Sequence, residues 1–283
     1  MRSIDKVVNS ENVMMGQFQI SQPLPVKQLK QVDPFLLLHH AGPKSYNPGA
    51  KGLNVEAHPH TGFEPVTFVF SGEVEHRDSL GNESIIKSGG IQWITAGKGI
   101  VHSEKASPEF QKKGGEFEII QLWINLPKKL KKTEPKYYGY DVDDIPFYLS
   151  TDKKVRLNIV SGNFKTITGP VNSVTGITAY TANMQGMSNI DLEFKADENV
   201  IFYVLSGHVK VGDIDIGDKQ LVVFKKDGTQ INVQSLLNSK LLILAGNPIK
   251  EPVYHYGPFV LNSKDEVIDA IKDYESGKMG YLD

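Results

Sequence analysis

The 283-residue sequence contains no cysteine, which excludes disulfide bonds, thiolate metal sites and cysteine nucleophiles. It also lacks any stretch approaching the ~20 consecutive apolar residues that a membrane-spanning helix needs. The first residues, MRSIDKVVNSENV, are polar and include no apolar segment of the kind found in a secretion signal. These absences predict a soluble, cytoplasmic protein that does not bind a membrane.

The sequence also lacks a strong excess of one charge. It has 31 Lys and Arg residues and 33 Asp and Glu residues, which give a formal net charge of −2. Such a balance creates no field that attracts nucleic acid, so we expect no direct nucleic-acid partner. The basic run KKLKK at 128–132 is local, and we interpret it as part of a solvated linker. The 40% apolar content supplies core for two compact domains.

Short apolar runs separated by turn residues fill most of the chain, for example VTFVFSGEVEH (66–76) and ENVIFYVLSGHVKV (198–211). Their β-branched and aromatic residues predict an all-β barrel or sandwich. TFVFSGEV (67–74) matches FYVLSGHV (202–209) at an offset of 135 residues, so we infer a duplicated β domain.

From this repeat we expect an N-terminal domain over residues 1–130, a linker over 131–150 and a C-terminal domain over 151–283. The linker falls in a segment rich in Pro, Lys and Asp. One helix is predicted near the C-terminus, in SKDEVIDAIKDYESG, with Ser263 as N-cap, Glu266 completing a capping box and Gly277 ending it. We expect this helix to pack on a barrel and to take no part in chemistry.

Two histidine-containing pairs have the spacing of side chains on one face of a strand. His58 and His60 form the first pair, and His102 and Glu104 repeat the spacing in VHSE. If the pairs lie on neighbouring strands, three imidazoles and one carboxylate converge inside the barrel mouth. Such ligands suit a first-row divalent metal, and on an octahedral ion they leave two positions for substrate, water or dioxygen.

The alternative is that each histidine is an ordinary surface or hydrogen-bonded residue, but three of eight histidines in two such pairs favour a metal site. His76 is better explained as a packed residue or one that supports a ligand. His39 and His40 are adjacent, so only one can face inward, and His208 and His255 have no partner at ligand spacing.

The repeat also bears on the second domain. At an offset of 135 residues, His58 and His60 correspond to Glu193 and Lys195, and nothing like HSE follows the later strands. We therefore expect the second domain to bind no metal.

The histidine pairs also match a known motif. The chain resembles a cupin in the pattern G-x5-H-x-H-x3-E, formed by Gly52, His58, His60 and Glu64, and in a looser second motif that ends at His102. Longer pieces resemble the pirin family: HPHTGFEPVTFVFSGEVEHRDSLGN (58–82), GGIQWITAGKGIVHSE (89–104) and QLWINLP (121–127). This resemblance implies a bicupin, with two jelly-roll β-barrels and a C-terminal helix.

The resemblance implies one mononuclear metal site in the N-terminal barrel, with Fe(II) as the expected ion and Mn, Co, Ni or Zn as alternatives. Carried over to this chain, the ligands are His58, His60, His102 and Glu104. Glu64, the ordinary cupin glutamate, is then expected to orient a ligand imidazole. Thr61 replaces the Arg that pirins usually have after H-P-H, which puts the substrate preference in doubt.

The activity implied by the resemblance is that of a flavonol 2,3-dioxygenase, which opens quercetin, a small aromatic substrate, with dioxygen. Glu104 would be catalytic as the general base for the acidic enol hydroxyl. The alternative is a metal- or redox-dependent regulatory protein that binds a transcription factor or a metabolic enzyme without turnover. A sugar-processing isomerase or lyase is a third alternative, which the lack of a Lys/Arg pair near the ligands argues against.

Overall fold

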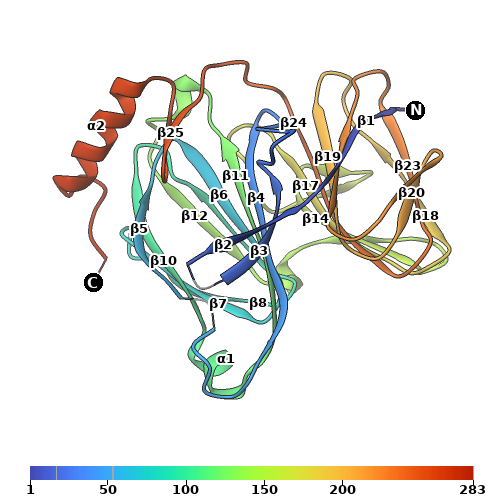
Figure 1. Cartoon of the computed structure of the whole chain (residues 1–283), viewed down its shortest axis with the longest axis horizontal. Coiled ribbons are helices and arrows are strands. Elements are labelled where there is room, and N and C mark those ends of the chain that lie inside the picture. The colour runs from blue at the N-terminus through green and yellow to red at the C-terminus, as the bar shows by residue number, and fades with distance from the viewer. Residues whose placement is uncertain (17, 53, 283) are drawn as a thin grey trace. The chain divides into compact units, whose positions relative to one another are not determined.

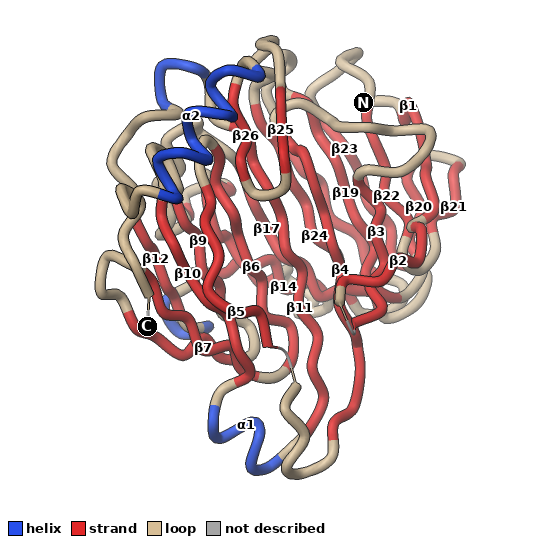
Figure 2. The backbone as a smooth tube through the Cα atoms, turned by 60° about the vertical axis from the view of Figure 1, so that its left-hand side comes forward, coloured by secondary structure: helices blue, strands red, loops and turns tan. Residues whose placement is uncertain are grey.

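The computed structural model describes residues 1–16, 18–52 and 54–282. Within them the chain is mostly β-strand, with two helices, α1 (Pro108–Lys113) and α2 (Lys264–Glu275) (Figures 1 and 2). It divides into two compact units, which we call the N-terminal barrel (residues 40–142 and 249–283) and the C-terminal barrel (residues 1–39 and 143–248). The predicted all-β fold with two cupin domains is confirmed. Neither helix has the length and apolar character needed to cross a bilayer.

The N-terminal barrel contains a long and a short antiparallel sheet. The strand order of the long sheet includes β12-β9-β6-β11-β4, and that of the short sheet is β5-β10-β7-β8. The strands are β4 (Phe35–Tyr46), β5 (Asn54–His60), β6 (Phe63–Ser71), β7 (Glu73–Asp78), β8 (Glu83–Lys87), β9 (Ile91–Thr95), β10 (Ile100–Ala106), β11 (Gly115–Asn125) and β12 (Lys136–Tyr140).

The C-terminal barrel repeats this arrangement with the orders β1-β22-β19-β24-β17-β14-β13 and β18-β23-β20-β21. Its strands are β1 (Ile4–Asn9), β13 (Phe147–Leu149), β14 (Val155–Ser161), β17 (Thr178–Met184), β18 (Ser188–Glu193), β19 (Asn199–Ser206), β20 (Val209–Val211), β21 (Ile214–Ile216), β22 (Gln220–Phe224), β23 (Gln230–Ser235) and β24 (Ser239–Gly246). Two further antiparallel pairs in this unit are β2 (Glu11–Met15) with β3 (Phe18–Leu24), and β15 (Asn163–Phe164) with β16 (Ile167–Thr168).

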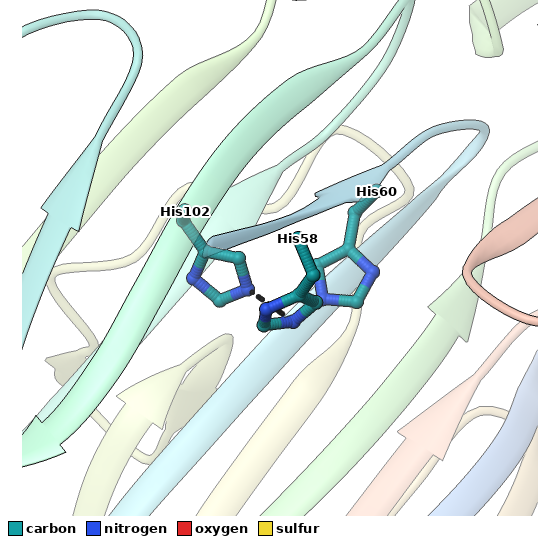
Figure 3. Close-up of side chains that lie close together, drawn as sticks. All are labelled: His58, His60 and His102. Atoms are coloured by element: carbon teal, nitrogen blue, oxygen red, sulfur yellow. Dashed lines mark hydrogen bonds between the residues drawn. The ribbon is translucent and has the colours of Figure 1, made fainter. Parts of the chain in front are cut away.

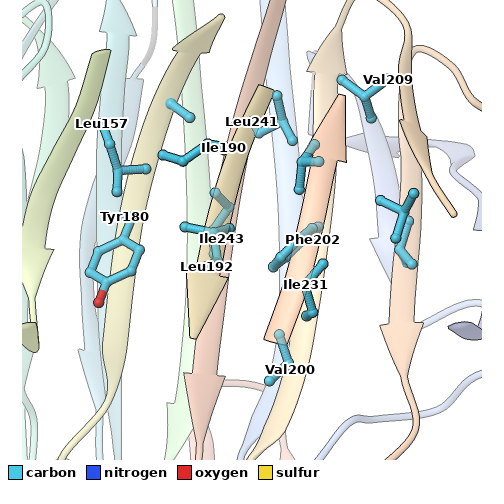
Figure 4. Packing of buried hydrophobic residues seen from close by; sticks show 14 of the residues in the cluster. Leu157, Tyr180, Ile190, Leu192, Val200, Phe202, Val209, Ile231, Leu241 and Ile243 are labelled. Carbon is cyan, nitrogen blue, oxygen red and sulfur yellow. The ribbon is translucent and has the colours of Figure 1, made fainter. Parts of the chain in front are cut away.

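The two sheets of the C-terminal barrel pack through one apolar cluster (Figure 4). Leu157, Phe202 and Ile243 come from the long sheet, and Leu192 and Ile231 come from the short sheet. Each is at most 1% exposed. Alternation along each strand places these side chains inward, which is how a two-layer β domain forms its core.

The C-terminal helix belongs to the N-terminal barrel. Helix α2 contacts the hairpin of β25 (Tyr254–Tyr256) and β26 (Phe259–Leu261), and its Val267 joins an apolar cluster with Val101 of β10. The predicted cap is present, because the Ser263 hydroxyl accepts a hydrogen bond from the Glu266 N–H at 3.2 Å. The helix therefore packs behind a strand that contains predicted metal ligands.

The compact units differ from the linear division expected from the sequence. Strand β1 pairs with β22, so the first residues complete the C-terminal barrel, and the last residues pack in the N-terminal barrel. Residues 131–150, expected to be a linker, contain β12 paired with β9 and β13 paired with β14. Short 3-10 helices, Lys128–Leu130 and Val142–Asp144, flank β12. Sheet pairing between distant segments is not visible in local composition.

Lys131 was expected to be solvated within this linker, but it is 2% exposed. Its ammonium donates hydrogen bonds to the carbonyls of Gly62 and Val260 at 2.8 and 3.0 Å, and to Asn125 Oδ1 at 2.6 Å. Lys131 therefore joins the turn after β5, the end of β11 and the C-terminal hairpin.

Candidate metal centre

Strands β5 and β10 bring the two histidine pairs together. They run antiparallel with His58 directly opposite His102, and the register shifts between His102 and Glu104. Opposite residues in an antiparallel pair point to the same face of the sheet. The expectation that the pairs lie on neighbouring strands is therefore met, although the shift in register makes Glu104 oppose Val55.

The three imidazoles point their Nε2 atoms toward one another (Figure 3). The Nε2 atom of His58 lies 3.1 Å from that of His60 and 3.1 Å from that of His102. Ligand atoms of all three residues lie within 4.8 Å of one another. We call His58, His60 and His102 the imidazole triad.

The hydrogen bonding of His58 fixes which of its nitrogens is free. Its Nδ1 atom lies 2.8 Å from the backbone carbonyl of Glu56, and a carbonyl can only accept, so Nδ1 carries the proton. In neutral His58 the Nε2 atom then presents a lone pair to the other two rings. This is the tautomer that a metal-binding imidazole needs, oriented by a backbone acceptor.

Burial favours the uncharged form of two members of the triad, His60 and His102. His60 and His102 are 2% and 0% exposed, and His58 is half-buried. Desolvation lowers the pKa of both His60 and His102 well below the ordinary histidine value, and the neighbouring imidazoles lower it further. Neutral imidazoles are the form that coordinates a divalent ion.

The donor set fits such an ion by distance as well. Two nitrogens bound at ~2.1 Å and at right angles around one ion lie ~3.0 Å apart. The observed Nε2 separations of 3.1 Å agree with this value. Three imidazole nitrogen donors in a preformed cluster are suited to first-row transition metals.

Glu104 is buried beside the triad, but its carboxylate is not part of the cluster of ligand atoms found among the described residues. Its Oε1 atom accepts hydrogen bonds from Thr67 Oγ1 at 2.9 Å and from Gln92 Nε2, and its Oε2 atom accepts one from Gln121 Nε2 at 3.3 Å. Three neutral donors thus hold the carboxylate. Its predicted role as a ligand stays a prediction.

Aromatic rings pack against the triad. Phe63 and Trp123 lie edge-on to His60, with ring centroids 5.0 and 5.6 Å away. The backbone of Thr61 forms hydrogen bonds with Pro258 and Val260, so the C-terminal hairpin also supports the strand end that holds His60. These contacts restrict how the His60 ring can turn.

His76 lies on the next strand, opposite Glu104. Its ring stacks on Tyr137 at 4.2 Å, and its Nε2 atom lies 3.0 Å from Asp78 Oδ2. The ring centroid is 5.5 Å from that of His102, so His76 packs behind the triad and is not part of it.

Glu64 is fully buried and accepts a hydrogen bond from Thr95 Oγ1 at 2.8 Å.

Sequence reasoning found the three histidines, but it did not single out Thr67, Gln92 and Gln121 around Glu104. The signal in the sequence was their place on predicted strands, at positions that alternate with outward-facing residues. Their convergence on Glu104 depends on strand order, which the spacing does not reveal.

The repeat identifies the matching positions of the C-terminal barrel. Val74 of β7 and Val209 of β20 are equivalent in the repeated motif. Val74 pairs with Ala106, and Val209 pairs with Ser235. Ala106 on β10 is therefore equivalent to Ser235 on β23.

Four residues earlier on those strands, His102 corresponds to Ile231. Since His102 pairs with His58 and Ile231 pairs with Leu192, the ligand pair is matched by two apolar residues. The expected match of His58 with Glu193 is displaced by one residue, because the chain from Leu192 to Phe202 is one residue longer than the chain from His58 to Thr67. A slip of one residue exchanges the two faces of a strand.

Comparison with known proteins agrees with this architecture. Residues 17–124 match the family model described as Pirin, and residues 179–280 match the Pirin C-terminal cupin domain. The chain is 35% identical over 249 residues to a putative quercetin 2,3-dioxygenase of Pseudomonas aeruginosa, covering 88% of this chain and 87% of that protein. It is also 32% identical over 268 residues to a pirin-like protein of Arabidopsis thaliana, and this match covers 90% of this chain and 82% of that protein.

Solved structures give the same result. A crystal structure of quercetin 2,3-dioxygenase from Acinetobacter baumannii matches with a TM-score of 0.93 and 32% identity, and the match covers all of both chains. The Escherichia coli pirin YhhW, solved in complex with nickel(II), shares the fold with a TM-score of 0.68 at 17% identity, over 86% of this chain and 99% of that one.

The repeated barrels and the imidazole triad inside one of them define a bicupin with a candidate metal site. The chain belongs to the pirin family.

Proposed function

We propose that this pirin is a metal-dependent dioxygenase that acts on a flavonol such as quercetin, with one divalent ion, Fe(II) in the first instance, bound by the imidazole triad. The observation that supports it most is the convergence of the imidazole triad, in which the Nε2 atom of His58 lies 3.1 Å from that of His60 and 3.1 Å from that of His102. Relatives at 35% and 32% identity have names of this activity, which supports the same reaction class for this chain.

A bound ion would supply Lewis-acid stabilisation of negative charge on a substrate oxygen. The protein supplies the rest. Glu104 is a buried carboxylate on β10, where it pairs with His76 of β7. It would accept the proton of the acidic enol hydroxyl. The hydrogen bonds from Thr67 and Gln121 hold it in place for that transfer. In this proposal Glu104 also completes the ligand set once an ion is present.

The test combines metal content with turnover. Metal-free protein is loaded in turn with Fe(II), Mn, Co, Ni and Zn, and loss of the flavonol absorption band in air is followed. Turnover with at least one ion at one ion per chain is expected. Tight stoichiometric binding without turnover for any ion would contradict the dioxygenase and favour the regulatory alternative, which a metal-dependent pull-down of a protein partner would then test.

A further inference from the structure

The C-terminal hairpin packs against the strand end that holds His60. The Thr61 N–H donates a hydrogen bond to the Pro258 carbonyl at 3.3 Å, and the Val260 N–H donates one to the Thr61 carbonyl at 3.1 Å. A side-chain carbon on Gly62 would collide with the Val260 carbonyl, so a glycine is needed for this close approach. The hairpin is therefore bonded to the backbone directly after one predicted ligand.

The same C-terminal segment also reaches β10, which holds His102. Val267 of α2 and Met279 beyond it belong to one buried apolar cluster with Val101, the residue before His102. Ser79 joins the two backbones, because its hydroxyl donates to the Met279 carbonyl at 2.7 Å and accepts from the Val101 N–H at 3.1 Å. Contacts of this one segment thus lie beside both strands of the imidazole triad.

These contacts matter most for the two buried rings. His58 has an acceptor for its Nδ1–H in the Glu56 carbonyl, but His102 has none, because its Nδ1 atom is buried and no described residue forms a hydrogen bond with it. The orientation of the His102 ring therefore depends on packing and on the position of the β10 backbone. His60 is the last residue of β5, paired with Ile100, and the ends of a strand open more easily than its middle.

We propose that residues 258–279 form a clasp that holds the ends of β5 and β10 together and so sets the spacing of the imidazole triad. Ser79 and Met279 are then positioning residues for the metal ion. This inference rests on the ion bound by the triad in the proposed function, and it does not depend on flavonol cleavage. Because coupling between two binding events is reciprocal, a bound ion should stabilise the closed clasp, and a loosened clasp should weaken ion binding.

The first measurement is the Co(II) affinity of the full-length protein, obtained by competition with a chelator of known affinity. Ser79→Ala and Met279→Ala keep all three imidazoles, yet each should lower the affinity by about tenfold or more, as loss of groups that orient ligands does. Met184→Ala is the matched control, because Met184 is 3% exposed in the C-terminal barrel and Met279 is 4% exposed. It should change the affinity by less than about twofold, since it leaves β5 and β10 untouched.

The second measurement is hydrogen exchange of the full-length wild type with and without one equivalent of Co(II), followed by mass spectrometry. Loading should slow exchange in the clasp as well as in β5 and β10, and β17 and β24 of the other barrel serve as the internal reference. In His58→Ala the same addition should leave exchange in the clasp unchanged. Ser79→Ala removes a single hydroxyl, so it keeps the affinity test valid if Met279→Ala fails to fold.

The clasp would be overturned, and the metal site left intact, by either of two results. One is equal Co(II) affinity in Ser79→Ala and Met184→Ala, and the other is a bound ion that does not change exchange in residues 258–279. A wild-type protein that retains no Co(II) would overturn the clasp together with the metal site. Neither measurement uses turnover, so the dioxygenase activity is tested separately.

Discussion

The N-terminal barrel places His58 opposite His102, whereas the C-terminal barrel places Leu192 opposite Ile231 at the equivalent positions. The strand order around both pairs is the same, β5-β10-β7-β8 in one barrel and β18-β23-β20-β21 in the other. In the first barrel the pair belongs to the imidazole triad, and in the second it belongs to the apolar core. The same scaffold therefore presents either a site or a packed interior, according to the side chains on one inward row.

The difference extends to buried charge. The N-terminal barrel buries Glu64, Asp78, Glu104, Glu118 and Lys131, while the described part of the C-terminal barrel buries Arg2 and Glu198. A buried charged group costs free energy unless it is hydrogen-bonded, whereas a buried Leu or Ile stabilises the fold by about 1.5–3 kcal/mol. We infer that the C-terminal barrel contributes mainly to stability, whereas the N-terminal barrel keeps the polar groups that the proposed function uses.

Removing one triad member should have the largest effect. We expect His102→Ala to lower the affinity for a divalent ion by more than ~100-fold, beyond the loss seen for outer-sphere partners, and to abolish turnover. Competition with a chelator of known affinity measures the first effect, and metal content after dialysis supports it. His208→Ala, at a half-exposed histidine of the other barrel, is the control. Equal metal binding by both variants would contradict a triad-bound ion.

Glu104→Gln should separate turnover from metal binding. Glutamine is isosteric, but it is neutral and cannot accept the enol proton. We expect the rate of flavonol cleavage to fall by about 10²–10⁴-fold. Metal content should fall much less, because the three imidazoles remain. Parallel losses of ion and rate would mean that Glu104 acts only as a ligand.

Ile231→Ala tests the opposite role of the C-terminal barrel. Ile231 is 1% exposed, so its truncation should cost about 2–5 kcal/mol of unfolding free energy through lost burial and a cavity. Denaturant unfolding of the metal-free protein measures this cost. The ion affinity of the folded variant should stay within twofold of wild type. A large loss of metal affinity would show that the two roles are not separate.

The buried ammonium of Lys131 gives a smaller, pH-dependent effect. Burial lowers its pKa from 10.5 to about 8. Because the unfolded chain binds the proton more tightly, the penalty for burying the charge is present below pH 8 and is relieved as the pH rises from about 8 to 10.5. This pKa difference corresponds to about 3 kcal/mol as an upper value.

We therefore expect the stability of wild type, relative to that of Lys131→Met, to increase over this pH range. Urea unfolding at a series of pH values gives the slope, and Lys132→Met serves as the exposed control. An identical pH profile for wild type and Lys131→Met would show that Lys131 does not titrate with a lowered pKa.

Local patterns in the sequence predicted much of this molecule. Alternation placed His58 and His60 on one face, and the capping box predicted helix α2 at Ser263. These features depend on neighbouring residues, and a strand or a helix has a fixed period. The repeat predicted two barrels of one type.

Pairings between distant segments could not be predicted in the same way. The pairing of β1 with β22, the pairing of β12 with β9, the shift in register before Glu104 and the burial of Lys131 all depend on which segments meet. The match of His58 with Leu192, instead of Glu193, depends on one extra residue between Leu192 and the repeated motif that begins at Phe202. These outcomes depend on long-range pairing, and a shift of one residue in strand register moves a side chain to the opposite face of the sheet.

The most direct test of the central claim is X-ray absorption spectroscopy of metal-free protein that has received one equivalent of Co(II), together with its metal content. The account predicts one ion per chain with imidazole scattering from three histidines, and loss of that signal in His58→Ala but not in His208→Ala. An ion without imidazole ligands, or no retained ion at all, would contradict it.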